Sequence, residues 1–188
     1  RNLQIQWTAF FSPIFNDEFA AACQSAGLTS MDLGTDAFCD VTLKGYHKFF
    51  TVEDIFRSCE LCRKYGIKYN HSMIFGGPGE TMETLAETVK NIDASDPDSI
   101  IGFVGVRLYP NTPILKDVGI DEVGIEPEFY LSPDVKDKIV DYLLDICATH
   151  KNWIIPGLEK GVNMKLFERM RKKGIKGQLW ELMKSWSR

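Results

Sequence analysis

The sequence predicts an α/β fold: a partial parallel (β/α) barrel of about four strand–helix units, followed by a mostly helical C-terminal extension. Four β-rich segments each lead into an amphipathic segment with helix-start and helix-stop residues. Repeated units of this kind, with short connections, are typical of an α/β barrel or an open parallel sheet. Only about four units fit before the pattern changes, which excludes a closed eight-stranded barrel. We expect the barrel-like part to cover residues 1–115 and the extension to cover residues 116–188.

The first unit begins with a β-rich segment, Gln4–Phe10. A helix follows from about Asp17, with Asn16 as its N-cap and Gly27 as its stop signal. The second strand is predicted over Thr29–Leu33, and a longer loop follows it.

The second helix and the third unit carry clear start signals. Thr51 caps a helix with Asp54 three residues on, a weak variant of the capping box, and this helix ends at Gly66. The third strand is predicted over Lys68–Phe75, and Thr81 opens the helix that follows it.

The fourth strand is predicted over Ile100–Leu108, an apolar run broken only by Arg107. Such runs suit a parallel sheet that is buried on both faces. Glycine and proline residues then interrupt any regular pattern up to Ser132. Ser132-Pro133 is expected to start a long helix that ends near His150.

The tail, from Trp153 onward, predicts two short helices separated by Gly174. Basic and apolar residues alternate there, which favours a solvated basic face whose aromatic side chains pack on the domain. A docking surface for an acidic partner is the alternative. The residues concerned are Arg169, Arg171, Lys172, Lys173, Lys176, Leu179, Trp180, Leu182 and Trp186.

Composition narrows the function classes. The formal net charge of −4 gives the 188-residue chain no overall basic footprint for nucleic acid. No apolar run reaches transmembrane length, and we expect no membrane partner. The five cysteines are mostly isolated, which favours a reducing, cytoplasmic setting over a disulfide framework. The chain begins without Met and runs directly into a strand pattern, so we expect a fragment of a longer protein.

Polar residues and glycines gather where the predicted strands end. Ligands of parallel α/β folds bind at the carboxyl ends of the strands. Acidic and basic side chains that converge there can hold a zwitterion, with its carboxylate on Arg and its ammonium on Asp or Glu. The candidate binding residues are Gly34, Thr35, Asp36, Gly76, Gly77, Glu80 and Arg107.

The glycine turn after the third strand is the most informative of these ends. Its glycines let backbone approach a ligand closely, because glycine lacks a Cβ and tolerates positive φ. The turn lacks the lysine of a phosphate-binding loop, and Glu80 would repel a phosphate. A neutral or cationic ligand therefore suits it better than a nucleoside triphosphate.

Each candidate also has a purely structural explanation. Asp36 could serve only as a turn residue, and Glu80 could only favour the dipole of the following helix. Lys48 is interpreted as a plain surface lysine. A charge that ends a buried strand needs a partner, so function is favoured for Arg107.

The cysteines predict no metal site. Cys59 and Cys62 share one face of a predicted helix, but a metal would need two further ligands, and no second pair exists. We interpret both as buried structural residues. No Ser-His-Asp or Cys-His arrangement is visible, so the catalytic residues stay unassigned.

Three blocks resemble, in family order, the later part of the radical S-adenosylmethionine (SAM) enzymes. They are Asp32–Asp36 with the helix start at Thr51, the glycine block Phe75–Thr81, and Gly105–Pro113. The broad group includes the methylthiotransferases and the cobalamin-dependent members. The resemblance covers about residues 3–115.

The resemblance implies half of a (β/α)6 barrel with SAM at the strand carboxyl ends. A [4Fe-4S] cluster on a C-x-x-x-C-x-x-C loop would cleave SAM to a 5′-deoxyadenosyl radical. Gly76 and Gly77 would then lie against adenine or ribose, and Glu80 would support the turn or the ligand. Thr35, Asp36 and Arg107 would hold ribose or the methionine zwitterion, or contact the substrate.

One departure from the family is decisive for the expected activity. No C-x-x-x-C-x-x-C occurs in this sequence. We therefore expect the cluster ligands to lie outside this chain, the chain alone to be inactive, and its exposed strand edges to form a homodimer. Cobalamin is a further candidate cofactor of the parent enzyme, and its substrate is unknown. The alternatives are a non-catalytic α/β binding or interaction module and another small-molecule (β/α) barrel enzyme.

Overall fold

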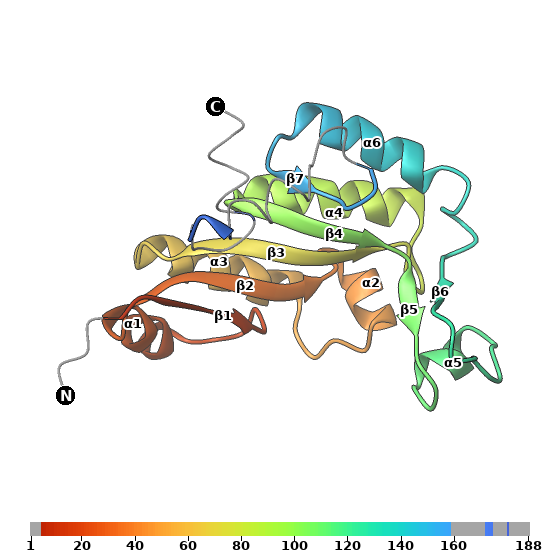
Figure 1. Ribbon diagram of the computed structural model, residues 1–188, viewed down its shortest axis with the longest axis horizontal. Helices are drawn as coiled ribbons and strands as arrows, with labels where there is room; N and C mark the ends of the chain where they lie inside the picture. The colour runs from red at the N-terminus through yellow and green to blue at the C-terminus, as the bar shows by residue number, and fades with distance from the viewer. Residues whose placement is uncertain (1–4, 159–171, 175–179, 181–188) are drawn as a thin grey trace.

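A computed structural model describes residues 5–158, 172–174 and 180 (Figure 1). Its main element is a five-stranded sheet with the order β1-β2-β3-β4-β7, and every neighbouring pair in it is parallel. The strands are β1 (Trp7–Phe11), β2 (Leu28–Asp36), β3 (Lys68–Phe75), β4 (Ser99–Val104) and β7 (Trp153–Ile154). The predicted parallel α/β architecture is confirmed.

The larger helices pack on one face of this sheet. Buried residues of five helices share one apolar core with strand residues such as Met31, Met73 and Ile100. The helices are α1 (Asp17–Ser25), α2 (Asp40–Gly45), α3 (Val52–Lys64), α4 (Met82–Ser95), α5 (Ile114–Asp117) and α6 (Ile139–Thr149). The strand arrowheads in Figure 1 point to one edge of the sheet, where α2 and the segment after β4 lie.

Three of the predicted helix starts are confirmed by their caps. Asn16 Oδ1 accepts a hydrogen bond from the Phe19 N–H at 2.9 Å. Thr51 and Asp54 form a complete capping box at the start of α3, and Thr81 forms another at the start of α4. These caps satisfy backbone donors that the first helical turn leaves open.

The predicted fourth strand, Ile100–Leu108, is wrong as a single element. β4 ends at Val104, and Gly105 adopts a φ of +85°, which turns the chain out of the sheet. The next strand, β5 (Val106–Leu108), pairs antiparallel with β6 (Glu128–Tyr130) in a separate two-stranded sheet (Figure 1).

The predicted start of the long helix is also wrong. α6 begins at Ile139, and residues 133–138 form turns instead. Ser132 is tied elsewhere, because its N–H donates to the Gly76 carbonyl at 2.7 Å and its hydroxyl donates to the Glu80 carbonyl at 2.8 Å. The predicted end near His150 is confirmed.

Part of the predicted extension belongs to the main core. Ile139 and Leu143 of α6 and Trp153 of β7 lie in the same buried cluster as the strands. The division at residues 115 and 116 stays a prediction. Most of the predicted tail helices and basic residues lie outside the described residues.

A row of buried polar side chains crosses the sheet face opposite the helices. Asp32, Asn70 and Ser99 are register partners on β2, β3 and β4. Asn70 donates to Asp32 at 3.1 Å, and Ser99 donates to Asn70 at 3.1 Å. The indole N–H of Trp180 also donates a hydrogen bond to Asp32 at 3.0 Å. We call these four residues the polar floor.

Among the described residues, no helix is long and apolar enough to cross a membrane. The cytoplasmic setting stays a prediction.

Candidate functional site at the ends of β2 and β3

The carboxyl end of β2 presents an ion pair. The register of β2 and β3 shifts between Leu33 and Asp36, and Asp36 adopts a left-handed φ of 59°. Its carboxylate pairs with the Lys48 ammonium, and each side chain is 25% exposed. The interpretation of Lys48 as a plain surface lysine is therefore wrong. A ligand at this edge would meet both charges.

Tyr46 follows α2 and packs against the end of β3, and no sequence pattern pointed to it. Its hydroxyl donates to the Ile74 carbonyl at 3.0 Å. Burial raises its pKa well above the usual value, and the carboxylates of Glu80 and Asp36 raise it further. Tyr46 therefore stays protonated and neutral at the centre of the site.

Glu80 folds back on its own turn. Its side chain is buried and accepts a hydrogen bond from the Gly76 N–H. Burial raises the pKa of Glu80 to about 7, although the Gly76 and Gly77 amides favour the charged form. Of the two roles expected for Glu80, support of the turn is the one its contacts display.

The two glycines of the turn leave room for the protein's own side chains. A Cβ on Gly76 would lie 2.1 Å from Leu131 Cδ1, and a Cβ on Gly77 would lie 2.0 Å from Tyr46 Oη. Both positions must therefore be glycine for the fold itself. Their contact with adenine or ribose stays a prediction.

Thr35 points to the helix side of the sheet. Its hydroxyl lies 2.7 Å from His71 Nδ1, and His71 Nε2 lies 3.2 Å from the Ser95 hydroxyl. His71 is fully buried, and burial lowers its pKa to about 3. The Ser95 hydroxyl donates to the Ile92 carbonyl at 2.7 Å, so it accepts from Nε2–H while Nδ1 accepts from Thr35. Thr35 thus holds a neutral core histidine.

Gly34 and Arg107 lie in different surroundings. Gly34 is half-buried, and a Cβ there would find its nearest atom, the Phe11 carbonyl oxygen, at 3.8 Å. Arg107 is an exposed residue of β5, and its guanidinium lies over the Tyr109 ring at 4.9 Å. The argument that Arg107 ends a buried strand is wrong, because β4 ends before it. The structure therefore groups Gly34 with the strand ends and places Arg107 on the second sheet.

Known proteins resemble this chain in sequence and in fold. Residues 4–92 match the family model for the Radical SAM superfamily. This match covers slightly less than half of the chain, so over these residues the chain is similar to the radical SAM superfamily.

Relatives of this chain include enzymes of different activities. The chain is 29% identical over 111 residues to tryptophan 2-C-methyltransferase of Streptomyces laurentii, and this alignment covers 55% of the chain and 18% of the relative. The chain is 25% identical over 146 residues to the anaerobic magnesium-protoporphyrin IX monomethyl ester cyclase of Rubrivivax gelatinosus, and this alignment covers 75% of the chain and 26% of the relative. The chain thus spans about a quarter or less of the length of these relatives.

Solved structures share the radical SAM fold. The methyltransferase TsrM from Kitasatospora setae, with tryptophan and a SAM analogue bound, aligns with a TM-score of 0.79 at 22% identity. That alignment covers 96% of this chain and 45% of TsrM. Coproporphyrinogen III oxidase (HemN) from Escherichia coli aligns with a TM-score of 0.58 at 20% identity, over 77% of this chain and 32% of HemN.

The paired thiols of this chain, Cys59 and Cys62, do not fit an iron–sulfur cluster. Cys59 and Cys62 are buried under the sheet, as expected, and burial raises the pKa of each to about 12. Iron is ligated by thiolates, so protonated core thiols are poor ligands. The described residues bring together no group of three or more His, Cys, Asp or Glu side chains that could hold a metal ion.

Proposed function

We propose that this chain forms the part of a radical SAM enzyme that binds SAM and substrate at the strand carboxyl ends. The cluster ligands, in this proposal, are contributed from outside the chain. The superfamily match and the fold support the family assignment. The Asp36–Lys48 pair supports the binding site.

The single observation that carries this proposal is the position of that pair. The methionine part of SAM is a zwitterion, with an α-ammonium and an α-carboxylate. Asp36 would take the ammonium and Lys48 the carboxylate, so each would exchange its present partner for the matching ligand group. Lys48 replaces Arg107 in the role expected for a basic residue, because Arg107 lies on the second sheet.

The other site residues would orient the ligand rather than pair with it. Tyr46 and Glu80 hold the end of β3 and its glycine turn, and a Cβ on Gly34 would meet no atom closer than 3.8 Å. SAM bound at a reduced cluster supplies the 5′-deoxyadenosyl radical of the family. A requirement for cobalamin is a further proposal, supported by the TsrM structure that carries cobalamin and a [4Fe-4S] cluster.

Calorimetric titration of the chain with SAM tests the binding site. Asp36→Asn and Lys48→Met should each weaken binding about tenfold or more, because each removes one charged partner of the zwitterion. Arg107→Gln is the matched control and should bind SAM as the unchanged chain does. Equal affinity in all four proteins would contradict this placement of the site.

Anaerobic incubation with iron and sulfide tests the cluster assignment. The chain alone should develop no visible charge-transfer absorbance, because burial keeps Cys59 and Cys62 protonated and the described residues gather no set of metal ligands. A stoichiometric four-iron cluster on this chain would contradict the assignment of the ligands to another part of the enzyme.

A second candidate is a non-catalytic binding module of the same fold. The lack of a C-x-x-x-C-x-x-C motif in this sequence favours it. The coding sequence upstream of Arg1 separates the two candidates: a three-cysteine loop there supports the enzyme, and an open reading frame that starts near Arg1 supports the binding module.

A further inference from the structure

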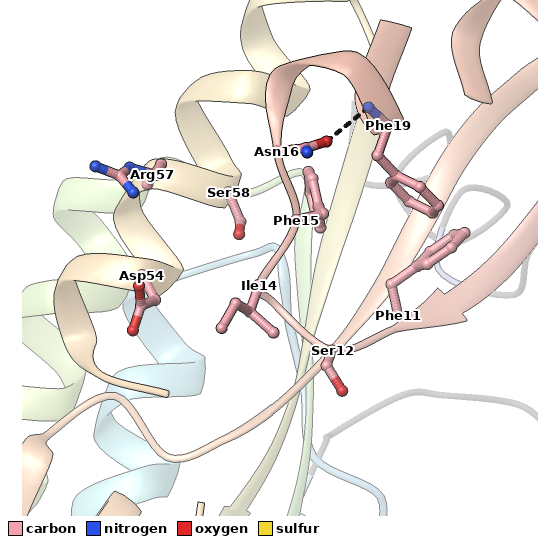
Figure 2. Close-up of a pocket in the computed structure, with 9 residues that line it drawn as sticks. All are labelled: Phe11, Ser12, Ile14, Phe15, Asn16, Phe19, Asp54, Arg57 and Ser58. Carbon is pink, nitrogen blue, oxygen red and sulfur yellow. Dashed lines mark hydrogen bonds between the residues drawn. The ribbon is translucent and has the colours of Figure 1, made fainter. Parts of the chain in front are cut away.

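A cavity of about 580 Å³ opens on the helix side of the sheet, and neither Asp36 nor Lys48 is among the residues that line it (Figure 2). It lies between the connection from β1 to α1 and the first turns of α3. Cavities that bind small molecules usually measure about 300–1,000 Å³, so the size suits one such ligand.

The inner walls of this cavity are apolar. Phe11, Ile14 and Phe15 line it, with Phe19 packed edge-on against Phe11 at a ring separation of 5.5 Å. Ile14 is 45% exposed, so part of its apolar side chain is open at the cavity. A ligand with a ring-sized apolar body would bury this surface.

One polar atom at this cavity lacks a protein partner. Ser58 is 1% exposed, and its Oγ makes no hydrogen bond in the described part of the chain. Figure 2 shows the Ser58 side chain directed from α3 toward the space beside Ile14 and Phe15. Buried hydroxyl groups normally have a hydrogen-bond partner, so a ligand group at this point would complete the site.

The rim of the cavity carries balanced charge. Asp54 and Arg57 both lie on α3 at its edge. The Thr51 amide and hydroxyl, with a smaller contribution from Arg57, hold the pKa of Asp54 below its usual value, so it is charged. One negative and one positive charge at the rim give no preference for an ion, which favours a neutral ligand.

We propose that this cavity binds a neutral small molecule with an aromatic ring and one hydroxyl group, and that the hydroxyl hydrogen-bonds to Ser58. The ring contacts Phe11, Ile14 and Phe15. The site is separate from the proposed SAM site and does not depend on it.

Two small probes test this proposal by NMR titration of the ¹⁵N-labelled chain. Benzyl alcohol carries the hydroxyl, and toluene is the matched probe without it. Benzyl alcohol should shift the amides around Ile14 and Ser58 and bind about fivefold more tightly than toluene, the effect expected for one neutral hydrogen bond.

Variants separate the cavity from non-specific binding. Ser58→Ala should fold normally, since its Oγ has no protein partner to lose, and should remove the preference for benzyl alcohol. Thr88→Val is the control, because Thr88 also has a buried, unpartnered hydroxyl but lies on α4 outside this cavity. Asp36→Asn should bind both probes unchanged. Equal affinity for the two probes, or a preference that survives Ser58→Ala, would overturn the proposal.

Discussion

The indole Nε1 of Trp180 donates a hydrogen bond to Asp32 Oδ1 at 3.0 Å, between positions 148 residues apart in the sequence. Trp180 is 1% exposed, so this bond is shielded from water. It ties the C-terminal segment to the central part of the sheet through the polar floor. Residue 180 therefore contributes to the fold that holds the candidate site.

Replacement of Trp180 by Phe should lower the free energy of unfolding by about 1–3 kcal/mol, because it removes a buried donor from a charged acceptor. Chemical denaturation of the two proteins measures this difference. Trp7→Phe is the matched control: its indole N–H donates to the Ala26 carbonyl at an exposed position, so a smaller loss is expected. Equal losses for the two variants would show that the buried bond to Asp32 contributes no more stability than the exposed bond of Trp7.

Glu80 should make the protein less stable as the pH rises from about 4.5 to about 7. Its pKa in the folded state is about 7, above the ordinary value of 4.5, so the folded state binds more protons than the unfolded state in this range. Glu80→Gln keeps an oxygen acceptor for the Gly76 N–H and should remove this trend, with a difference of up to about 3 kcal/mol. Denaturation of both proteins across this pH range measures it, and parallel curves would contradict the assignment.

His71 should oppose Glu80 at acid pH. Its folded pKa is about 3, below the ordinary 6.5, so the stability it confers is present above pH 6.5 and is lost as the pH falls toward 3. NMR of the imidazole resonances should show no titration of His71 between pH 8 and about 4. A His71 midpoint near 6.5 would mean that the ring is accessible to water.

Thr35→Val should destabilise the fold by about 1–2 kcal/mol without a change in SAM affinity. The substitution removes the hydroxyl that donates to His71 Nδ1 and leaves a buried acceptor unpaired. Calorimetry with SAM and chemical denaturation of the same variant separate the two effects. Weaker SAM binding at unchanged stability would restore Thr35 to the list of ligand contacts.

Gly77→Ala should destabilise the fold by several kcal/mol, since its Cβ would overlap the Tyr46 ring. Tyr46→Leu removes the overlapping atoms, so the double variant should be more stable than the sum of the two single losses predicts. A double-mutant cycle measures this coupling. Additive losses would show that Tyr46 does not fill the space beside Gly77.

Local signals predicted much of the fold. The caps at Asn16, Thr51 and Thr81 placed three helix starts, because a cap depends on residues only a few positions away. The bounds of β3 were also predicted correctly, since a run of strand-forming residues stops at glycine. Parallel pairing followed from the alternation of strands and helices.

Long-range contacts explain the failures. The apolar run through Gly105 looked continuous, and only its positive φ and the antiparallel partner β6 reveal the break. Ser132 has the sequence of a helix start, but its hydrogen bonds go to the distant glycine turn. Both outcomes depend on contacts with segments remote in sequence, which local patterns do not encode.

The positions of Asp36 and the glycine turn at strand ends were predicted correctly, and the position of Arg107 was predicted wrongly. Asp36 and the glycine turn were placed at neighbouring strand ends because parallel strands end on one edge. The pairing of Asp36 with Lys48 depends on the path of the loop between them, for which the sequence has no periodic signal. Tyr46 was missed for the same reason.

The polar floor lies at a set distance from the strand ends. Asp32 lies four residues before Asp36 on β2, and a strand advances about 3.3 Å per residue, so about 13 Å of strand separates the floor from the ion pair. Trp180 covers Asp32 at that depth through its hydrogen bond. A ligand that pairs with Asp36 and Lys48 in the proposed site would therefore have to extend about 13 Å along the sheet before it touched the floor.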